Sequence, residues 1–427
     1  MKAGLRVWLL NASEQLAYSG SERRRMRTGL LARALLERGH QVVWWKSTFE
    51  HVSKEHYRNS DGFEEVETGL TVGWLHSRGY QGHVSAARVL DHAQVGAKFG
   101  IAARKRERPD VIVCSMPIPD LALAGAVYGR RRGVPVVVDI RDWWPEALTY
   151  GLSPVLRKAA LGVLFPHSIL VEHTCRKAKA ITGITDEFVD WGLEKAGRER
   201  RRLDRAFPHG YEVPTIANEQ REQAARYWNR AGIGSDEDSL VVTFIGSVTR
   251  SFDFGPIMDA AHKLASAGVE AKFVICGDGD RLEATRALAR GLDNVVFTGQ
   301  WVGPAQIREL LTRTSIGLVP LPDRPDFLAT INNKTIEYLS AGVPIVVGPP
   351  ASHVARLVER ERCGVSLSFD SPVELTARIR ALLEDRTRLD QLSERARALY
   401  DERYSAKRVY GAFARHVEEI SESAMVR

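Results

Sequence analysis

Short apolar segments alternate with amphipathic segments along the whole chain of 427 residues. The apolar segments are rich in Val and Ile, which is typical of strands in a parallel sheet that is covered on both faces. In the first half we expect strands at residues 5–10, 41–45, 71–75, 111–114, 134–140 and 180–182, and helices at 21–38, 84–106 and 119–132. The second half repeats the pattern with strands at residues 240–245, 272–276, 295–298, 316–319, 345–347 and 364–368.

This alternation predicts an α/β protein with two doubly wound domains, because strands that alternate with helices build parallel sheets between helical layers. The chain is long enough to form two hydrophobic cores. A charged stretch at residues 198–237 separates the two series of strands and contains Pro208, Gly210 and Pro214, which interrupt regular structure. We therefore place the domain junction near residue 208, between a first domain at residues 1–207 and a second at 208–400.

Composition narrows the class of protein. The formal net charge is +7, and arginines gather at residues 23–27 and 198–205. Such clusters are typical of solvated surfaces and can attract anionic lipid, but aromatic residues are not interleaved with them, so we predict no nucleic-acid binding. The four cysteines are far apart in the sequence, which indicates a reduced cytoplasmic protein. No run of 18 uncharged apolar residues occurs, so we expect no membrane span.

One segment, NNKTIEYLSAGVPIV from Asn332 to Val346, suggests chemistry. Lys334 and Glu337 are three positions apart, so they share one face of a predicted helix. Gly342 suits the left-handed end of that helix, and a strand follows. A lysine in the first helical turn suits a phosphate, and a carboxylate one turn later suits sugar hydroxyls. The segment therefore predicts a nucleotide-sugar site, with a solvated ion pair as the alternative.

The loops after strands are the other places where a doubly wound sheet binds ligands. Gly20 precedes the first predicted helix, where a backbone can approach a phosphate or a sugar. Arg141, Asp142 and Glu146 follow the strand at residues 134–140, in the sequence RDWWPE. Asp142 is placed to orient or deprotonate an acceptor hydroxyl while Arg141 braces a charge. The alternative is an ion pair that only stabilises the loop.

These motifs together resemble glycosyltransferase family 4, retaining enzymes of the GT-B fold. The segment around Lys334 resembles the donor-site helix of that family. The segments VVVDIRDWWPEAL and WLHSRGYQGHVSAAR resemble its fucosamine-transferase-like group, which builds bacterial surface polysaccharides; the second match is partial. The resemblance implies two Rossmann-like domains that face each other across a cleft. It also implies a final helix, at residues 401–427, that crosses back to the first domain.

The resemblance implies a role for each matching residue. It assigns donor binding to Gly20, Gly246, Arg250, Gly277, Lys334, Thr335 and Glu337, with Glu337 on the ribose. It assigns catalysis to Asp142, Arg250, Lys334 and Glu337, and the acceptor side to Arg141, Asp142 and Glu146.

Two departures from the family pattern affect the expected donor site. Ala329 occupies the position where many members carry another glutamate, so the identity of the donor sugar is not predicted. Asp326 or backbone amides would then supply those contacts. A second basic residue of the diphosphate site is also missing, because the stretch at residues 252–254 is Phe-Asp-Phe.

The expected reaction is sugar transfer from a nucleotide-diphosphate donor, a UDP-sugar, to an acceptor hydroxyl with retention of configuration. Positive side chains and helix amides assist departure of the diphosphate, so we expect no metal and no other cofactor. The acceptor is a lipid-linked saccharide in polysaccharide or glycolipid assembly, or a small molecule. The expected location is cytoplasmic, with residues 23–27 of the first helix resting on the anionic inner face of the membrane.

Other functions stay open on the sequence. A sugar-nucleotide 2-epimerase shares the fold and the donor, and a soluble glycosyltransferase would act on a small metabolite. A scaffold that has lost catalysis is a third alternative. A dinucleotide-dependent dehydrogenase is disfavoured, because the strand at residues 5–10 is not followed by G-x-G-x-x-G.

Overall fold

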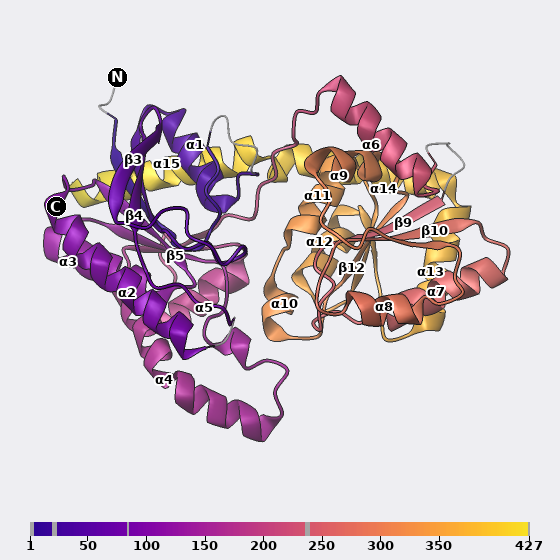
Figure 1. Ribbon diagram of the computed structural model, residues 1–427, viewed down its shortest axis with the longest axis horizontal. Coiled ribbons are helices and arrows are strands. Elements are labelled where there is room, and N and C mark those ends of the chain that lie inside the picture. Colours follow the sequence, from indigo (N-terminus) through magenta and orange to yellow (C-terminus); the bar gives the residue numbers. More distant parts are fainter. Residues whose placement is uncertain (1–3, 19–23, 83–84, 235–239, 426–427) are drawn as a thin grey trace. The chain divides into compact units, whose positions relative to one another are not determined.

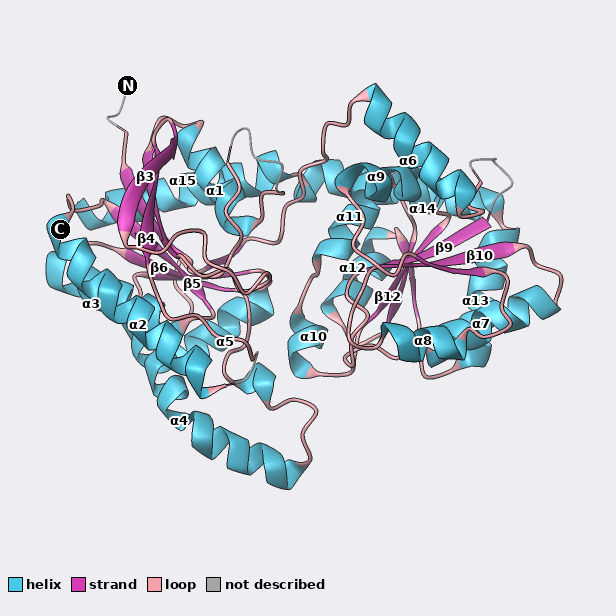
Figure 2. Ribbon diagram, in the orientation of Figure 1, coloured by secondary structure: helices cyan, strands magenta, loops and turns pink. Residues whose placement is uncertain are grey.

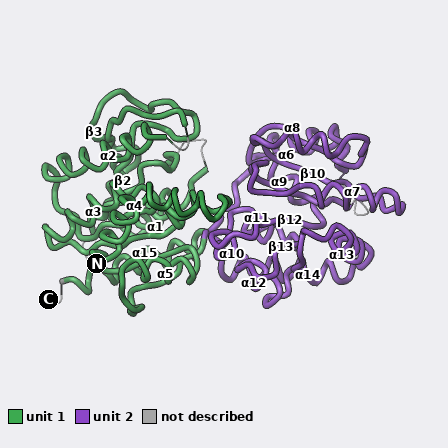
Figure 3. The backbone as a smooth tube through the Cα atoms, turned by 90° about the horizontal axis from the view of Figure 1, so that it is seen from below, with its two compact units in different colours: residues 1–208, 406–427 green, residues 209–405 purple. Residues whose placement is uncertain are grey.

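The computed structural model describes residues 4–18, 24–82, 85–234 and 240–425 (Figure 1). It divides into two compact units, one formed by Met1–Pro208 with Ala406–Arg427 and the other by His209–Ser405 (Figure 3). In each unit, helices cover both faces of one sheet, as Figure 2 shows. The structure thus confirms the predicted doubly wound α/β class for both halves of the chain.

The elements of the first unit follow the predicted alternation, with small shifts at their ends. They are β1 (Arg6–Leu10), α1 (Arg27–Leu36), β2 (Gln41–Ser47), β3 (Gly62–Glu67), β4 (Leu70–Leu75), α2 (Ala86–Ala102), β5 (Val111–Met116), α3 (Pro119–Arg132), β6 (Val136–Ile140), α4 (Pro154–Lys177), β7 (Ala180–Gly183), α5 (Asp186–Ala196), β8 (Arg205–Ala206) and α15 (Ala406–Met425).

The sheet of the first unit has the strand order β3-β4-β2-β1-β5-β6-β7-β8. All neighbouring strands are parallel except β3, which pairs antiparallel with β4 at the edge. The sequence pattern did not predict β3, because half of its residues, GFEEVE, are charged and none of them is buried. A solvated edge strand lacks the apolar run that marks a buried strand.

The last helix, α15, is part of the first unit. Its side chains Tyr410, Phe413 and Val417 are buried in the core of that unit. The ring of Phe413 stacks on that of Phe207 with centroids 4.5 Å apart. The helix begins at Ala406 rather than at 401, because residues 400–404 continue α14 as a π-helical turn whose tyrosines are buried in the second unit.

The elements of the second unit also match the predicted strands. They are α6 (Asn218–Arg230), β9 (Leu240–Ile245), α7 (Gly255–Ser266), β10 (Ala271–Cys276), α8 (Leu282–Leu288), β11 (Val295–Phe297), α9 (Pro304–Arg313), β12 (Ile316–Pro320), α10 (Pro325–Ala329), α11 (Asn333–Ala341), β13 (Ile345–Gly348), α12 (His353–Glu361), β14 (Gly364–Ser366), α13 (Pro372–Glu384) and α14 (Arg386–Leu399).

The second sheet is wholly parallel, in the order β11-β10-β9-β12-β13-β14. Successive strand residues point to opposite faces, so each strand contributes to two cores. In β9, Val241 packs with the core on one face while Val242 and Phe244 pack with the core on the other. Strands β10, β9 and β12 are parallel neighbours. The loops that follow them therefore lie at the same edge of the sheet.

Helix α4 differs from the other helices. Among the described residues it is the one helix long and apolar enough to cross a membrane by length and composition, and 11% of its most apolar stretch is buried. The sequence criterion of 18 uncharged apolar residues did not find it, because the helix carries Arg157 and Lys158.

Candidate functional site

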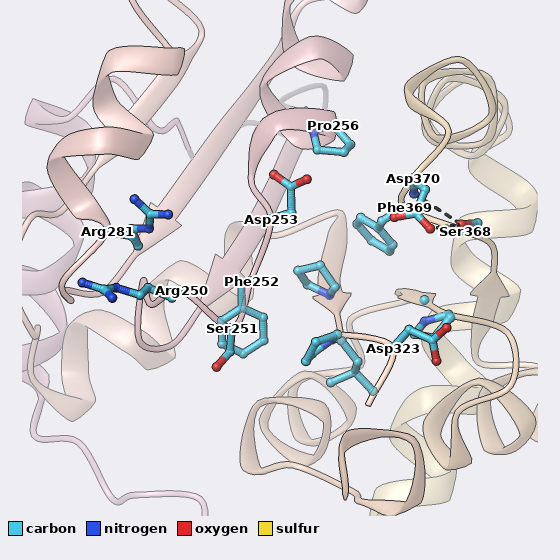
Figure 4. A pocket seen from close by; sticks show the side chains of 15 residues that line it. Arg250, Ser251, Phe252, Asp253, Pro256, Arg281, Asp323, Ser368, Phe369 and Asp370 are labelled. Atoms are coloured by element: carbon cyan, nitrogen blue, oxygen red, sulfur yellow. Dashed lines mark hydrogen bonds between the residues drawn. The ribbon is translucent and has the colours of Figure 1, made fainter. Parts of the chain in front are cut away.

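A cavity of about 330 Å³ lies at the carboxyl edge of the second sheet (Figure 4). It is lined by residues 250–253, 320–323 and 368–370, and by Pro256, Arg281, Gly348 and Pro349. These residues lie at the ends of β9, β10, β12, β13 and β14 or shortly after them. The cavity therefore occupies the position at which ligands of doubly wound sheets bind.

Two guanidinium groups contribute to this cavity. Arg250 was predicted from the sequence, and its side chain is 81% exposed, with Nε 3.2 Å from Oδ2 of Asp280. Exposed pairs of this kind are weak, so Arg250 can turn toward an anion at little cost. Arg281 lines the same cavity from the loop after β10 (Figure 4). Sequence reasoning missed Arg281, although its place shortly after a predicted strand was a usable signal.

Helix α11 positions Lys334 in its first turn. The side chain of Asn332 caps the helix by accepting hydrogen bonds from the backbone N–H of Thr335 at 3.0 Å and from its hydroxyl at 2.9 Å. Gly342 ends the helix with φ of 72°, as predicted. Capping of this kind satisfies one first-turn amide and fixes the geometry of the first turn.

The ammonium group of Lys334 contacts two aromatic rings. Its Nζ is 3.8 Å from the ring centroid of Phe244 and 4.5 Å from that of Phe252, which also lines the cavity. Both contacts are cation–π interactions. Within the described part of the chain, Lys334 donates no hydrogen bond to a protein acceptor. The three donors of this ammonium group are thus available to an anion.

Burial changes the charge state of Lys334. It lowers the pKa of this lysine to about 7, while the negative charge of Glu337 acts in the opposite direction. Glu337 lies one helical turn further on and is 6% exposed. A bound diphosphate would add negative charge beside Lys334 and would raise its pKa again.

Two glycines let the loops of this site approach each other. Gly246 and Gly277 have φ of 143° and 153°, which a side chain would strain. A Cβ atom on Gly277 would lie 2.0 Å from the carbonyl oxygen of Gly246, and one on Gly246 would lie 3.0 Å from Nζ of Lys334. The structure therefore brings Gly246, Gly277 and Lys334 together, as the strand-end argument predicts. Their roles toward a ligand stay predictions.

Other predicted donor residues have different surroundings. Thr335 is fully buried and its hydroxyl is engaged by Asn332, so its observed contact is a helix cap. Asp326, proposed as a substitute for the missing glutamate, forms an ion pair with Arg324 at 2.8 Å. Ala329 is buried at the end of α10. Gly20 lies outside the described residues.

In the first unit, a buried ionic network surrounds Asp139 at the centre of the sheet. Arg27 donates two hydrogen bonds to its carboxylate, at 2.7 and 2.8 Å, and Nε of Arg141 donates a third at 2.8 Å. Desolvation alone would raise the pKa of Asp139, but the two guanidinium groups outweigh it and hold that pKa well below its usual value. Arg141 also pairs with Glu14 at 2.8 Å.

This network bears on two expectations. The guanidinium of Arg141 is held by Asp139 and Glu14, so the contacts observed are those of an arginine that stabilises the loop, and its role toward an acceptor stays a prediction. Arg27 was expected on a membrane-facing surface, but it is 3% exposed and ion-paired inside the unit. The expectation for Arg27 was wrong because the partner that buries it lies far away in the sequence.

The remaining acceptor-side residues lie in the loop after β6. Asp142 is exposed to solvent, whereas Glu146 forms an ion pair with Lys195. Trp144, from the same loop, lies under the guanidinium of Arg88 at 5.1 Å. Arg88 also lies 5.7 Å from the ring of Tyr80. The two segments singled out for their resemblance, at residues 74–88 and 136–148, are therefore neighbours in the fold.

A histidine cluster adjoins these residues and was not predicted. Nδ1 of His51 lies 2.7 Å from the hydroxyl of Tyr80. The hydroxyl of Thr48 bonds to Nδ1 of both His56 and His76, each at 3.0 Å. These residues come from loops after β2 and β4 that are separate in the sequence, so no single motif marks them.

Both units match known sequence families. The sequence model of the glycosyl transferase 4-like domain matches residues 25–205, and that of glycosyl transferases group 1 matches residues 239–385. Together the two matches span most of both units. The chain is a glycosyltransferase of the GT-B fold.

Individual relatives of this glycosyltransferase are distant. It is 27% identical over 318 residues to the alpha-D-kanosaminyltransferase of Streptomyces kanamyceticus. The match covers 71% of this chain and 76% of the relative. Among solved structures it is similar to sucrose-phosphate synthase from Thermosynechococcus elongatus, with a TM-score of 0.73, 13% identity and coverage of 98% and 100%. It is also similar to HepE from Anabaena in complex with UDP-glucose, with a TM-score of 0.62, 15% identity and coverage of 99% and 100%.

Proposed function

We propose that this glycosyltransferase moves a hexosyl or N-acetylhexosaminyl group from a UDP-sugar to an acceptor hydroxyl, with retention of configuration. The observation that carries the proposal is Lys334, whose ammonium group contacts the rings of Phe244 and Phe252 beside Gly246 and donates no hydrogen bond within the described part of the chain. A cation placed in this way at the carboxyl edge of a sheet suits a diphosphate. The complex of HepE with UDP-glucose supports the choice of UDP.

In this proposal the protein supplies the charge that the reaction needs. Negative charge develops on the departing diphosphate as the bond to the sugar breaks, and Lys334 with the two cavity arginines stabilises it. Glu337 accepts hydrogen bonds from the ribose hydroxyls, and Asp142 serves the acceptor hydroxyl. No metal ion or other cofactor is required, because side chains and helix amides take that role.

For the acceptor we favour a lipid-linked saccharide in cell-surface polysaccharide or glycolipid assembly, as in the fucosamine-transferase-like group. The segment VVVDIRDWWPEAL, now seen beside residues 74–88, supports this choice. A small metabolite is the second candidate, because another similar protein is named 2-deoxystreptamine glucosyltransferase, after a small molecule. The enzyme is expected in the cytoplasm, in contact with the inner face of the membrane.

A donor screen tests the proposal. Nucleotide sugars are compared by thermal shift, because a ligand stabilises the folded state by about 2.7 kcal/mol when present at a hundredfold excess over its dissociation constant. NMR of the product then gives the anomeric configuration. Stabilisation by UDP-sugars and a product of retained configuration are expected. Epimerised donor in the absence of acceptor would identify a 2-epimerase instead, and the lack of a shift with any nucleotide sugar would contradict the proposal.

We expect diphosphate binding to take up a proton. In the free protein the pKa of Lys334 is lowered to about 7, so above that pH the amine is largely neutral. Binding requires the ammonium form, so affinity for UDP should fall by up to tenfold for each pH unit above about 7. UDP itself is fully ionised in this pH range, because the second pKa of a phosphate monoester is about 6. Calorimetry at about pH 8 in buffers of different ionisation enthalpy should show uptake of about one proton, and none in Lys334→Met.

We expect Glu337→Gln to weaken donor binding more than turnover. Loss of the carboxylate removes a charge-assisted hydrogen bond to the ribose. Such a bond contributes about 1.5–3 kcal/mol to the free energy of binding, so the dissociation constant of UDP should rise roughly tenfold to a hundredfold. Glu283→Gln, an exposed residue of the same unit, is the control. UDP binding that stays unchanged in Glu337→Gln would place the ribose elsewhere.

A further inference from the structure

The N-terminal part of α4 presents an apolar surface to solvent. No residue from 154 to 170 is buried. Val155 is 78% exposed, Val163 is 79% exposed and Phe165 is 60% exposed. Figure 1 shows this part of α4 extending away from the sheet of its own unit. Soluble proteins rarely leave a contiguous apolar surface of this kind in water unless it binds something.

The other end of α4 is anchored inside the first unit. Val171, Thr174 and Cys175 are buried, and the helix packs there against α3 and α5. Pro166 lies between the two parts and has no N–H to donate to the preceding turn, so the hydrogen-bond ladder is interrupted at that point. A helix whose last turns are built into a globular core cannot span a bilayer, but its projecting turns can enter one.

The charges on the projecting part favour an anionic surface. Between residues 149 and 171 the only Lys, Arg, Asp or Glu residues are Arg157 and Lys158, and the first acidic residue after them is Glu172. The guanidinium of Arg157 lies 4.9 Å from the ring centroid of Tyr150. Apolar side chains beside Lys, Arg and Tyr are the combination found in helices that rest in the headgroup region of anionic bilayers.

We propose that residues 152–169, the loop tip before α4 and its projecting turns, insert into the headgroup region of an anionic phospholipid bilayer. The inference rests on the proposed function, because it places the first unit at the surface where a lipid-linked acceptor would be found. It also moves the expected membrane contact away from α1, whose Arg27 is buried. A second copy of the chain is the alternative occupant of this face, and the tests below distinguish it from a bilayer.

Vesicle flotation tests the proposal. The wild-type protein should float with vesicles of phosphatidylcholine containing about 30% phosphatidylglycerol, and high salt should reduce this binding. Val163→Glu combined with Phe165→Glu should lower the bound fraction at least about tenfold, because two carboxylates would enter an apolar layer of negative potential. Val373→Glu, at an exposed valine of the second unit, is the matched control and should float like the wild type.

A fluorescent probe locates the contact. The four native cysteines are buried, so a single introduced cysteine can be labelled selectively. An environment-sensitive dye on Phe165→Cys should shift to shorter wavelength when the anionic vesicles are added, whereas the same dye on Val373→Cys should not. Equal shifts at both positions, or none at Phe165→Cys, would contradict insertion of α4.

Three outcomes overturn the proposal. They are the absence of wild-type flotation, unchanged flotation of the double glutamate variant, and a dimer of the wild-type protein that the variant dissociates without any vesicle binding. Thermal stabilisation by UDP, measured on the same variants without vesicles, tests the donor site independently. A variant that binds UDP normally but does not float separates loss of the membrane contact from failure of the proposed function, and circular dichroism shows that it is folded.

Discussion

Lys334→Met lowers kcat/KM for sugar transfer by about a hundredfold to a thousandfold, or about 3–4 kcal/mol of transition-state stabilisation. The reason is the setting of the ammonium group, in contact with the rings of Phe244 and Phe252 and with no hydrogen bond to an acceptor within the described part of the chain. Methionine fills the same apolar space, so the fold of the second unit should survive. What is lost is a half-buried cation that is placed to meet the departing diphosphate.

The measurement is initial rate against donor concentration, with thermal unfolding as a check on the fold. Lys263→Met, at an exposed lysine on α7 of the same unit, is the matched control and should keep wild-type activity. Lys334→Arg is informative as well, because a guanidinium keeps the charge but not the shape. A methionine variant with activity within about twofold of the wild type would remove this lysine from the site.

Asp139→Asn destabilises the first unit by about 3–5 kcal/mol, the usual cost of leaving one member of a buried ion pair without its partner. The carboxylate accepts hydrogen bonds from Arg27, Arg141 and Thr182, and asparagine cannot neutralise the two guanidinium groups. Urea unfolding followed by tryptophan fluorescence reports this change, because most tryptophans lie in the first unit. Glu172→Gln, in an exposed pair with Arg176, should cost about 0.5 kcal/mol or less.

The same residue sets a pH dependence. The pKa of Asp139 is lower in the folded protein than in the unfolded chain, so its contribution to stability is present at neutral pH and is lost as the pH falls below about 4. The asparagine variant should show a flatter stability profile in this acid range. A variant as stable as the wild type at neutral pH would mean that the network is compensated elsewhere in the unit.

The parts of the site that the sequence predicted are local. The helix with Lys334 and Glu337 could be read from its spacing and from the glycine that ends it, because caps and helix periodicity act within a few residues. Gly246 and Gly277 could be placed for a similar reason, since parallel strands put their following loops at one edge. Arg281 was missed only because basic residues were sought at one strand end and not at its neighbour.

The parts that it did not predict depend on distant partners. Arg27 was expected at the surface, but Asp139 lies more than a hundred residues further along the chain and buries it. The histidines of the cluster near Tyr80 come from different loops. The ion pair of Arg141 with Glu14 could not be foreseen either, because the two residues are far apart in the sequence. Charged groups satisfy one another through contacts that no local pattern encodes.

By itself the sequence determined the two α/β halves, the order of their strands along the chain and the helix that carries Lys334. The reason is that hydrophobic periodicity and the signals that begin and end a helix are properties of neighbouring residues. Only the tertiary structure decided which charges are buried and which apolar surface stays uncovered. Helix α4 shows the reason. Its apolar run is equally consistent with a core helix, and only the tertiary structure shows that Val171 and Cys175 are buried while Val163 and Phe165 face solvent.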